Sequence, residues 1–174
     1  MAIELSLAEL LFEEGQLTEA TRLAGEALTS VSELVVPSVH LLRARIFLAR
    51  GDLDEAHAAL QDVGEPVSLQ PRLRLRIQRA RLDSARGGPS KRKAASRSLR
   101  AVLAEAQRLG WLEGQFEARL ALAELELDSG MKASGLARLK TLERDARKSG
   151  WMRWAHNAAT LHVGGSRTDQ PVTR

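Results

Sequence analysis

The chain has 174 residues, which is enough for one domain or one short repeat array with a buried core. Hydrophobic residues make up 44% and charged residues 28% of it, so most of the chain is not of the disordered class. The chain has a formal net charge of +4 and no cysteine, and the lack of cysteine excludes disulfides, a thiol nucleophile and cysteine metal sites.

The composition favours helices throughout the chain. Alanine, leucine, arginine and glutamate dominate, whereas aromatic residues make up 3% and tyrosine is absent. No apolar run approaches the roughly 18 residues of a membrane span. Glu4 and Glu9 stand where a signal peptide would carry positive charge and an apolar stretch. We therefore expect an all-α, cytoplasmic protein.

In chain order, the apolar spacing and the glycine and proline positions predict four helical hairpins and a closing helix. The hairpins cover about 2–31, 37–63, 70–109 and 113–149, and the closing helix covers 151–163. The individual helices are expected near 2–14, 17–31, 37–50, 53–63, 70–86, 90–109, 113–129, 131–149 and 151–163. Residues 164–174 show no apolar period and are expected to be a disordered tail.

Glycines recur at near-regular intervals within this helical sequence, at Gly15, Gly51, Gly87 and Gly130. An alanine stands seven positions before each of them, at Ala8, Ala44, Ala80 and Ala123. Five positions after the glycine stands a small residue in three units, at Ala20, Ala56 and Gly135, and in the third unit it is displaced to Ala94 or Ala95. We expect each glycine to end a helix in the left-handed conformation, and the small residues to let consecutive helices cross closely.

This pattern resembles the tetratricopeptide repeat, a helix–turn–helix unit of about 34 residues. In the first unit the resemblance rests on Leu7, Ala8, Leu11, Gly15, Ala20, Ala27 and Leu28. In the second unit it rests on Ala44, Phe47, Gly51, Ala56 and Leu60, while the third and fourth units depart from the pattern with longer second helices. The resemblance implies a right-handed α-solenoid that binds a protein segment in its concave groove.

The C-terminal part of the chain carries a second repeat, because "RLGW" at 108–111 returns as "KSGW" at 148–151. Residues 104–160 are similar to the closing repeats of bacterial multidomain signalling proteins, which place such arrays after a kinase or a winged-helix DNA-binding domain. This resemblance implies an alternative role, as the C-terminal sensor or regulatory part of a larger bacterial kinase or transcription regulator.

The first helix is apolar on two faces. Ile3, Leu7 and Leu10 share one face, and Leu5 and Phe12 lie nearly opposite. A terminal repeat is expected to present a polar outer face. Three explanations stay open: residue 1 is the edge of a fragment, the helix forms a homodimer, or its own repeat covers both faces.

The sequence offers no convincing catalytic, cofactor or metal site. The four histidines, His40, His57, His156 and His162, show no ligand spacing, and no phosphate-binding glycine loop appears. The carboxylates of Glu124, Glu126 and Asp128 have the pattern of an ordinary helix surface. Trp111, Trp151 and Trp154 are expected to pack between hairpins. We expect a protein without enzymatic activity.

Charge is concentrated in one segment. Residues 1–71 hold 4 basic and 12 acidic side chains, whereas residues 72–100 hold 11 basic and 1 acidic. Arg72, Arg76 and Arg79 share one face of their helix and are the expected contacts for an acidic peptide or protein segment. Weaker candidates on the preceding first helix of a hairpin are His40, Arg43 and Phe47.

The second part of this basic segment begins the next helix, with Lys91, Arg92, Lys93, Arg97 and Arg100. Cations there oppose the helix dipole. Three interpretations remain open for the basic segment: a solvated face without a ligand, a docking surface for an acidic peptide, and a nucleic-acid-binding module. The scarcity of aromatic residues for base stacking speaks against the last.

Overall fold

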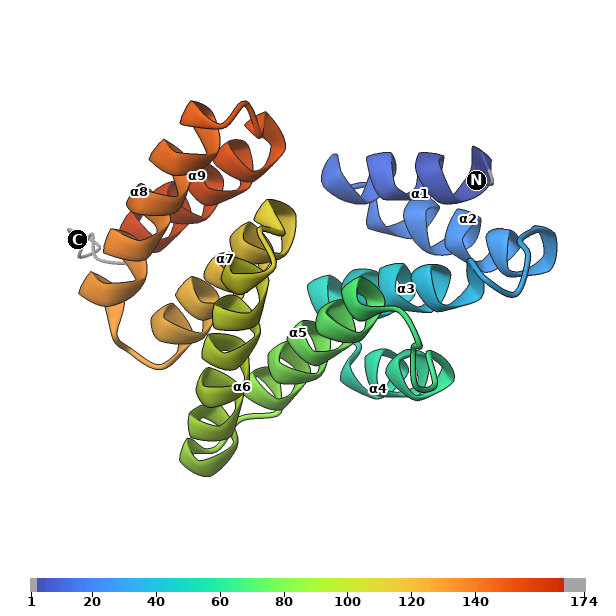
Figure 1. Cartoon of the computed structure of the whole chain (residues 1–174), viewed down its shortest axis with the longest axis horizontal. Helices are drawn as coiled ribbons and strands as arrows, with labels where there is room; N and C mark the ends of the chain where they lie inside the picture. Colours follow the sequence, from blue (N-terminus) through green and yellow to red (C-terminus); the bar gives the residue numbers. More distant parts are fainter. Residues whose placement is uncertain (1–2, 168–174) are drawn as a thin grey trace, which may run out of the picture. The chain divides into compact units, whose positions relative to one another are not determined.

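The computed structural model describes residues 3–167, and the part of the predicted tail at 168–174 lies outside the described residues. Figure 1 shows that this part of the chain is built from helices alone, which confirms the all-α prediction. The helices are α1 (Ile3–Glu13), α2 (Leu17–Ser30), α3 (Val36–Arg50), α4 (Leu53–Asp62), α5 (Leu69–Ala85), α6 (Pro89–Arg108), α7 (Leu112–Asp128), α8 (Lys132–Lys148) and α9 (Met152–Arg167). Apart from the end of α9, every helix begins and ends within one residue of its predicted range. α9 continues past residue 163, so residues 164–167, expected in the tail, are helical.

The chain divides into two compact units, unit 1 with residues 1–87 and unit 2 with residues 88–174. Unit 1 contains α1–α5 and unit 2 contains α6–α9. The boundary falls between Gly87 and Gly88, inside the range 70–109 that we expected to form one hairpin. In unit 1, α5 packs on α3 and α4, and in unit 2, α6 packs on α7. A single continuous array over 1–163 stays a prediction.

The recurring glycines end helices as predicted. At the end of α3, Gly51 has φ 81°, its amide donates to the carbonyl of Leu48 at 3.2 Å, and the next amide, of Asp52, donates to Phe47 at 2.9 Å. This pair of hydrogen bonds is the Schellman closure. The same pair follows α1, α6, α7 and α8, around Gly15, Gly110, Gly130 and Gly150. A left-handed residue is required at each of these turns, which explains the glycine.

The small residues of the repeat lie where helices cross. All of the repeated alanines are buried, including the displaced one, which is Ala95 and not the exposed Ala94. α7 and α8 approach each other closely at Gly135. A methyl group there would lie 2.8 Å from the Leu127 Cγ and 3.1 Å from the Ala123 carbonyl oxygen. The small residue at position 135 therefore allows α7 and α8 to lie close together, as expected of the repeated small residues.

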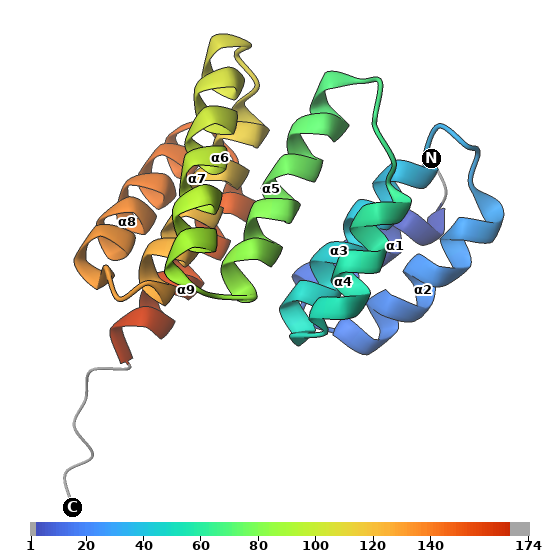
Figure 2. The same ribbon diagram turned by 90° about the horizontal axis from the view of Figure 1, so that it is seen from below.

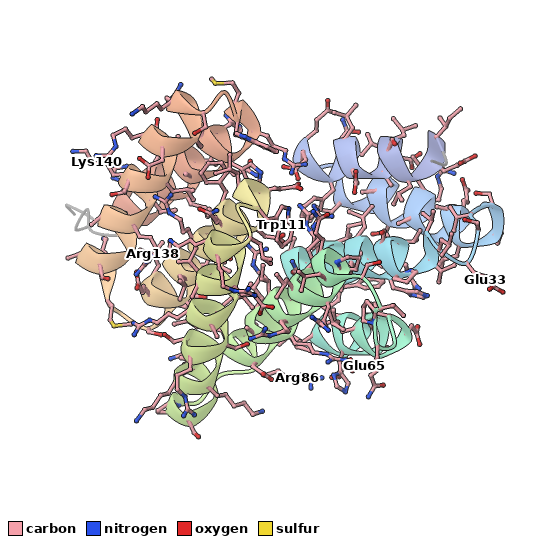
Figure 3. The ribbon with its side chains drawn as sticks, viewed as in Figure 1. Glu33, Glu65, Arg86, Trp111, Arg138 and Lys140 are labelled. Carbon is pink, nitrogen blue, oxygen red and sulfur yellow. The ribbon has the colours of Figure 1, made fainter. Side chains whose placement is uncertain are left out.

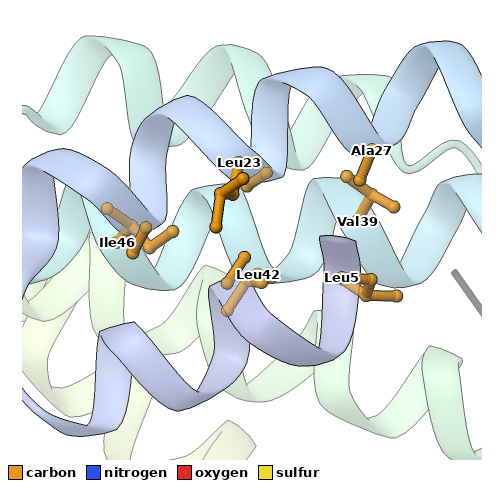
Figure 4. Packing of buried hydrophobic residues seen from close by; sticks show 9 residues of the cluster. Leu5, Leu23, Ala27, Val39, Leu42 and Ile46 are labelled. Carbon is orange, nitrogen blue, oxygen red and sulfur yellow. The ribbon is translucent and has the colours of Figure 1, made fainter. Parts of the chain in front are cut away.

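Unit 1 has two apolar clusters that share helix α3. One of them joins α1, α2 and α3 around Leu5, Leu23 and Leu42 (Figure 4). The other joins α3, α4 and α5, with Leu41 and Leu75 among its buried members. Because α3 contributes to both clusters, its position is fixed from two sides.

Unit 2 contains the 40-residue repeat as a structural duplication. Residues 91–110 and 131–150 are buried, half-buried or exposed in the same order at every position. α6 therefore corresponds to α8; Figure 2 shows the helices of this unit. Its main apolar cluster includes Phe116, Leu139 and Trp154. The burial pattern is shared although the contacts differ, because α8 packs on both α7 and α9 whereas α6 packs on α7.

The tryptophans have three different environments. Trp154 is 5% exposed and belongs to the core of unit 2. Trp151 packs edge-on against Phe116, with ring centroids 6.2 Å apart, but remains 36% exposed. The ring of Trp111 covers Gly114, where a methyl group would lie 2.1 Å from it. The expected packing role thus holds fully for Trp154 and partly for the other two.

No helix among the described residues combines the length and the apolar character needed to cross a membrane.

Candidate functional site

The predicted arginine strip lies on α5 in unit 1. Leu75 and Leu82 bury one side of this helix against α3 and α4, and Leu73 is also fully buried. Arg72 and Arg79 remain exposed, whereas Arg76 is half-buried. The guanidinium of Arg79 lies 3.7 Å from the carboxylate of Glu65, in the connection between α4 and α5. Both side chains are largely in solvent, with exposed fractions of 47% and 82%, so this is a weak surface ion pair.

The candidates on α3 are more buried than the sequence suggested. His40 is 9% exposed, and its Nδ1 lies 3.8 Å from a carboxylate oxygen of Asp62. Burial lowers the pKa of His40, Arg43 lowers it further, and Asp62 partly opposes both effects. Because the pKa of His40 is lowered, the imidazole is mostly neutral near neutral pH and adds little positive charge to the surface.

Phe47 is a packing residue and not an open contact. It is half-buried against the cluster shared by α3, α4 and α5, and the guanidinium of Arg43 lies over its ring at 5.6 Å from the centroid. Phe47 therefore has a packing role in the structure, and its predicted role as a partner contact stays a prediction. Its spacing from Gly51 identified a repeat position, and in a repeat such positions face the core. Arg43, which is half-buried on α3, stays a predicted contact.

The cations at the beginning of α6, in unit 2, are more exposed than the candidate residues on α3. Four of them, Lys91, Lys93, Arg97 and Arg100, are exposed, and Arg92 is half-buried. Within residues 3–167, none of these five side chains forms an ion pair with a carboxylate. The first turn of α6 also carries no acidic residue. The predicted cations thus lie at the start of a helix, as expected, and their role in binding nucleic acid stays a prediction.

Two ion pairs join α7 and α8, and the sequence analysis missed both. Glu126 has a side chain that is 5% exposed, and it accepts hydrogen bonds from Arg138 Nε at 3.0 Å and Nη2 at 2.6 Å. Arg138 is labelled in Figure 3. Asp145 accepts one from Arg119 at 2.9 Å. The sequence contained a signal for these pairs, because on each helix an arginine precedes a carboxylate by seven residues, Arg119 and Glu126 on one and Arg138 and Asp145 on the other. In an antiparallel hairpin each arginine can then meet the carboxylate of the other helix. These pairs hold the α7–α8 hairpin in register.

The Asp145 pair makes the stability of unit 2 depend on pH. Burial raises the pKa of Asp145, but hydrogen bonds from Arg119 and Arg144 outweigh it and leave the pKa below the ordinary value. A depressed folded-state pKa adds stability above the unfolded pKa of about 4, and this stability is lost as the pH falls through the folded value.

We therefore expect Asp145→Asn to lower the urea midpoint at pH 7 and to have little effect near pH 2. The loss at pH 7 should be at most about 1 kcal/mol because the pair is partly solvated. Urea unfolding followed by circular dichroism at pH 7, 4 and 2 measures it. Asp128→Asn, at an exposed position on the end of α7, is the control. An Asp145→Asn deficit that persists unchanged at pH 2 would contradict this explanation.

Two further observations concern other parts of the described chain. Among residues 3–167, no group of three or more histidine, cysteine or acidic side chains is placed to hold a metal ion.

On α1, Ile3, Leu7 and Leu10 are 81%, 43% and 54% exposed, while Leu5 on the opposite face is buried. Of the two apolar faces of α1, the face with Leu5 therefore lies in the core, and the face with Ile3, Leu7 and Leu10 lies outside it.

Comparisons with known proteins find no matching family model, no matching curated protein and no matching solved structure.

Proposed function

We propose that the chain is a non-catalytic binding module, a right-handed solenoid of tetratricopeptide-like hairpins, that holds an acidic segment of another protein on α5. The support for a repeat architecture is the set of Schellman closures together with the buried small residues at the helix crossings. In this proposal unit 1 provides the arginine surface. Arg72, Arg76 and Arg79 are its principal contacts, and Arg43 supports them from α3.

The observation that carries the proposal is the exposure of arginines on a helix that is otherwise fixed in the core. Arg72 is exposed and has no partner among the described residues, and Arg79 has only the long contact with Glu65. Leu73 and Leu75 are buried beside them and anchor the backbone. A guanidinium on a rigid helix pairs well with a carboxylate, because its planar donors match both oxygens. A ligand carboxylate would therefore replace Glu65 at small cost.

The test uses a fluorescein-labelled acidic peptide of 15 residues with alternating Glu and Leu as the probe. Arg72→Glu/Arg79→Glu should weaken its binding at least about 10-fold, which is about 1.4 kcal/mol. The reason is that both changes replace attraction by like-charge repulsion. Fluorescence anisotropy measures the affinity, and circular dichroism checks that helicity is retained.

The matched control is Lys140→Glu/Lys148→Glu, which makes the same change in net charge on two exposed lysines of α8. It should bind the peptide with little loss. Equal weakening by both variants would assign the effect to net charge alone and remove α5 as the site. A wild-type chain that fails to bind the probe would also contradict the proposal.

Two other roles remain proposals. In one, the chain is the regulatory part of a larger bacterial kinase or transcription regulator. In the other, the exposed apolar face of α1 forms a homodimer.

A further inference from the structure

The exposed face of α6 carries a line of cations longer than the cluster at its beginning. Lys93, Arg97, Arg100 and Arg108 are all exposed, and their spacing places them along one side of the helix. At 1.5 Å per residue the line extends for about 22 Å. Within residues 3–167 none of these four side chains pairs with a carboxylate. The sequence has no acidic residue between Asp83 and Glu105, so the helix itself compensates little of this charge.

The structural duplicate of α6 shows that packing does not require two of these cations. Helix α8 has the same burial pattern and has Ala133 and Ala137 at the positions equivalent to Lys93 and Arg97, whereas it keeps cations, Lys140 and Lys148, at the positions equivalent to Arg100 and Arg108. The exposed arginines of α8 also differ in their contacts, since Arg144 pairs with Asp145 and Arg147 pairs with Glu143. Among the four cations only Lys93 lies near the start of the helix, where the dipole disfavours a positive charge, and Arg108 lies in the last turn, where the dipole favours one. Lys93 and Arg97, for which α8 has alanine, are therefore not explained by packing or by the helix dipole.

The side chains between the cations limit what the ligand is. Ala94, Ala101 and Ala104 are exposed on this face, which makes it narrow and smooth. A protein partner is normally anchored by large apolar or aromatic side chains in a pocket, and a membrane surface by apolar side chains that insert. Residues 89–108 contain no aromatic residue, so single strands have nothing to stack on. What the face offers is a row of positive charges for a row of phosphates.

We propose that this face of α6 binds double-stranded DNA through its phosphates, without reading sequence. A duplex carries about one negative charge per 1.7 Å of axis, which suits an extended line of cations, and its backbone needs no pocket. The alanines allow the helix to approach closely. Lys93, Arg97 and Arg100 are the central contacts, and Arg108 extends them toward the end of the helix. This inference is independent of the acidic-segment site on α5.

The experiment measures binding of the whole chain to a fluorescein-labelled 20-base-pair random DNA duplex between 50 and 200 mM salt. With four phosphate contacts, the wild-type affinity should fall on the order of 100-fold over this range. Lys93→Ala/Arg97→Ala/Arg100→Ala should bind at least about 10-fold more weakly at 50 mM. It should also reduce the slope of log affinity against log salt by about 3. Alanine is a strong helix former, so the helix is retained.

The matched control is Lys140→Ala/Arg147→Ala/Lys148→Ala, which removes the same charge from α8. Little change in the control, together with the loss in the α6 variant, supports the inference. Equal losses in both variants, a salt-independent affinity or no binding would overturn it. A clear preference for a duplex RNA, an acidic peptide or anionic vesicles over the DNA duplex would likewise overturn the assignment of DNA as the ligand. The α5 variant Arg72→Glu/Arg79→Glu tests the other site separately, so either proposal can fail alone.

Discussion

Replacing Arg138 with alanine should lower the free energy of unfolding of unit 2 by about 2–3 kcal/mol, measured by urea denaturation. Arg138 supplies two hydrogen bonds to Glu126, whose side chain is only 5% exposed. Removing the guanidinium leaves a charged carboxylate in the helix contact without its donors. The cost of an unsatisfied buried charge exceeds the net value of the pair itself, which is why the expected effect is large.

Two further variants separate the lost partner from lost packing. In the double variant Glu126→Leu/Arg138→Leu the pair is replaced by apolar side chains, and at least half of the lost stability should return. Arg147→Ala removes an exposed pair with Glu143 on one helix and should cost no more than about 0.5 kcal/mol. If Arg138→Ala costs no more than Arg147→Ala, Glu126 has another means of compensation and this account is wrong.

Gly135→Ala should destabilise the protein by about 1–2 kcal/mol, although alanine is the better helix former by about 1 kcal/mol. The new methyl group would lie 2.8 Å from the Leu127 Cγ and 3.1 Å from the Ala123 carbonyl oxygen. The carbonyl belongs to the backbone of α7, so relieving the contact requires the two helices to move apart. Overpacking of this kind outweighs the gain in helix propensity.

The control is Gly25→Ala in the interior of α2. A methyl group at Gly25 would meet no atom within 4 Å, and the residue has ordinary helical geometry. This variant should therefore gain between about 0.5 and 1 kcal/mol. Thermal unfolding of both variants gives the comparison, with shifts in opposite directions. A stabilising Gly135→Ala would mean that the close crossing of α7 and α8 is absent.

The glycine spacing was sufficient to predict the ends of α1, α3 and α7. Gly15, Gly51 and Gly130 have the left-handed geometry expected of them, and the preceding helices end within two residues of each glycine. This succeeds because the closure is local: its hydrogen bonds join residues three and five positions apart. The burial of the repeated alanines follows from the same local repeat. Such features need no knowledge of distant parts of the chain.

The electrostatics could not be predicted in the same way. Glu126 belongs to a run of carboxylates that reads as a helix surface, yet it is buried because Arg138 on the next helix compensates it. His40 and Phe47 were proposed as contacts because they lie on the first helix of a hairpin, and in the structure His40 is buried beside Asp62 of α4 while Phe47 is half-buried against the cluster shared by α3, α4 and α5. In each case a second helix decides the environment of the residue, and the sequence of one helix does not contain that information.

The Schellman closures also have a consequence for the rate of folding. Consecutive helices such as α7 and α8 meet through a turn of a few residues, so their contacts join positions close together in the chain. Proteins dominated by local contacts pay little loop-closure entropy before their contacts form, and they fold within microseconds to milliseconds. Each hairpin is therefore expected to form early and on its own, without waiting for distant segments to find one another.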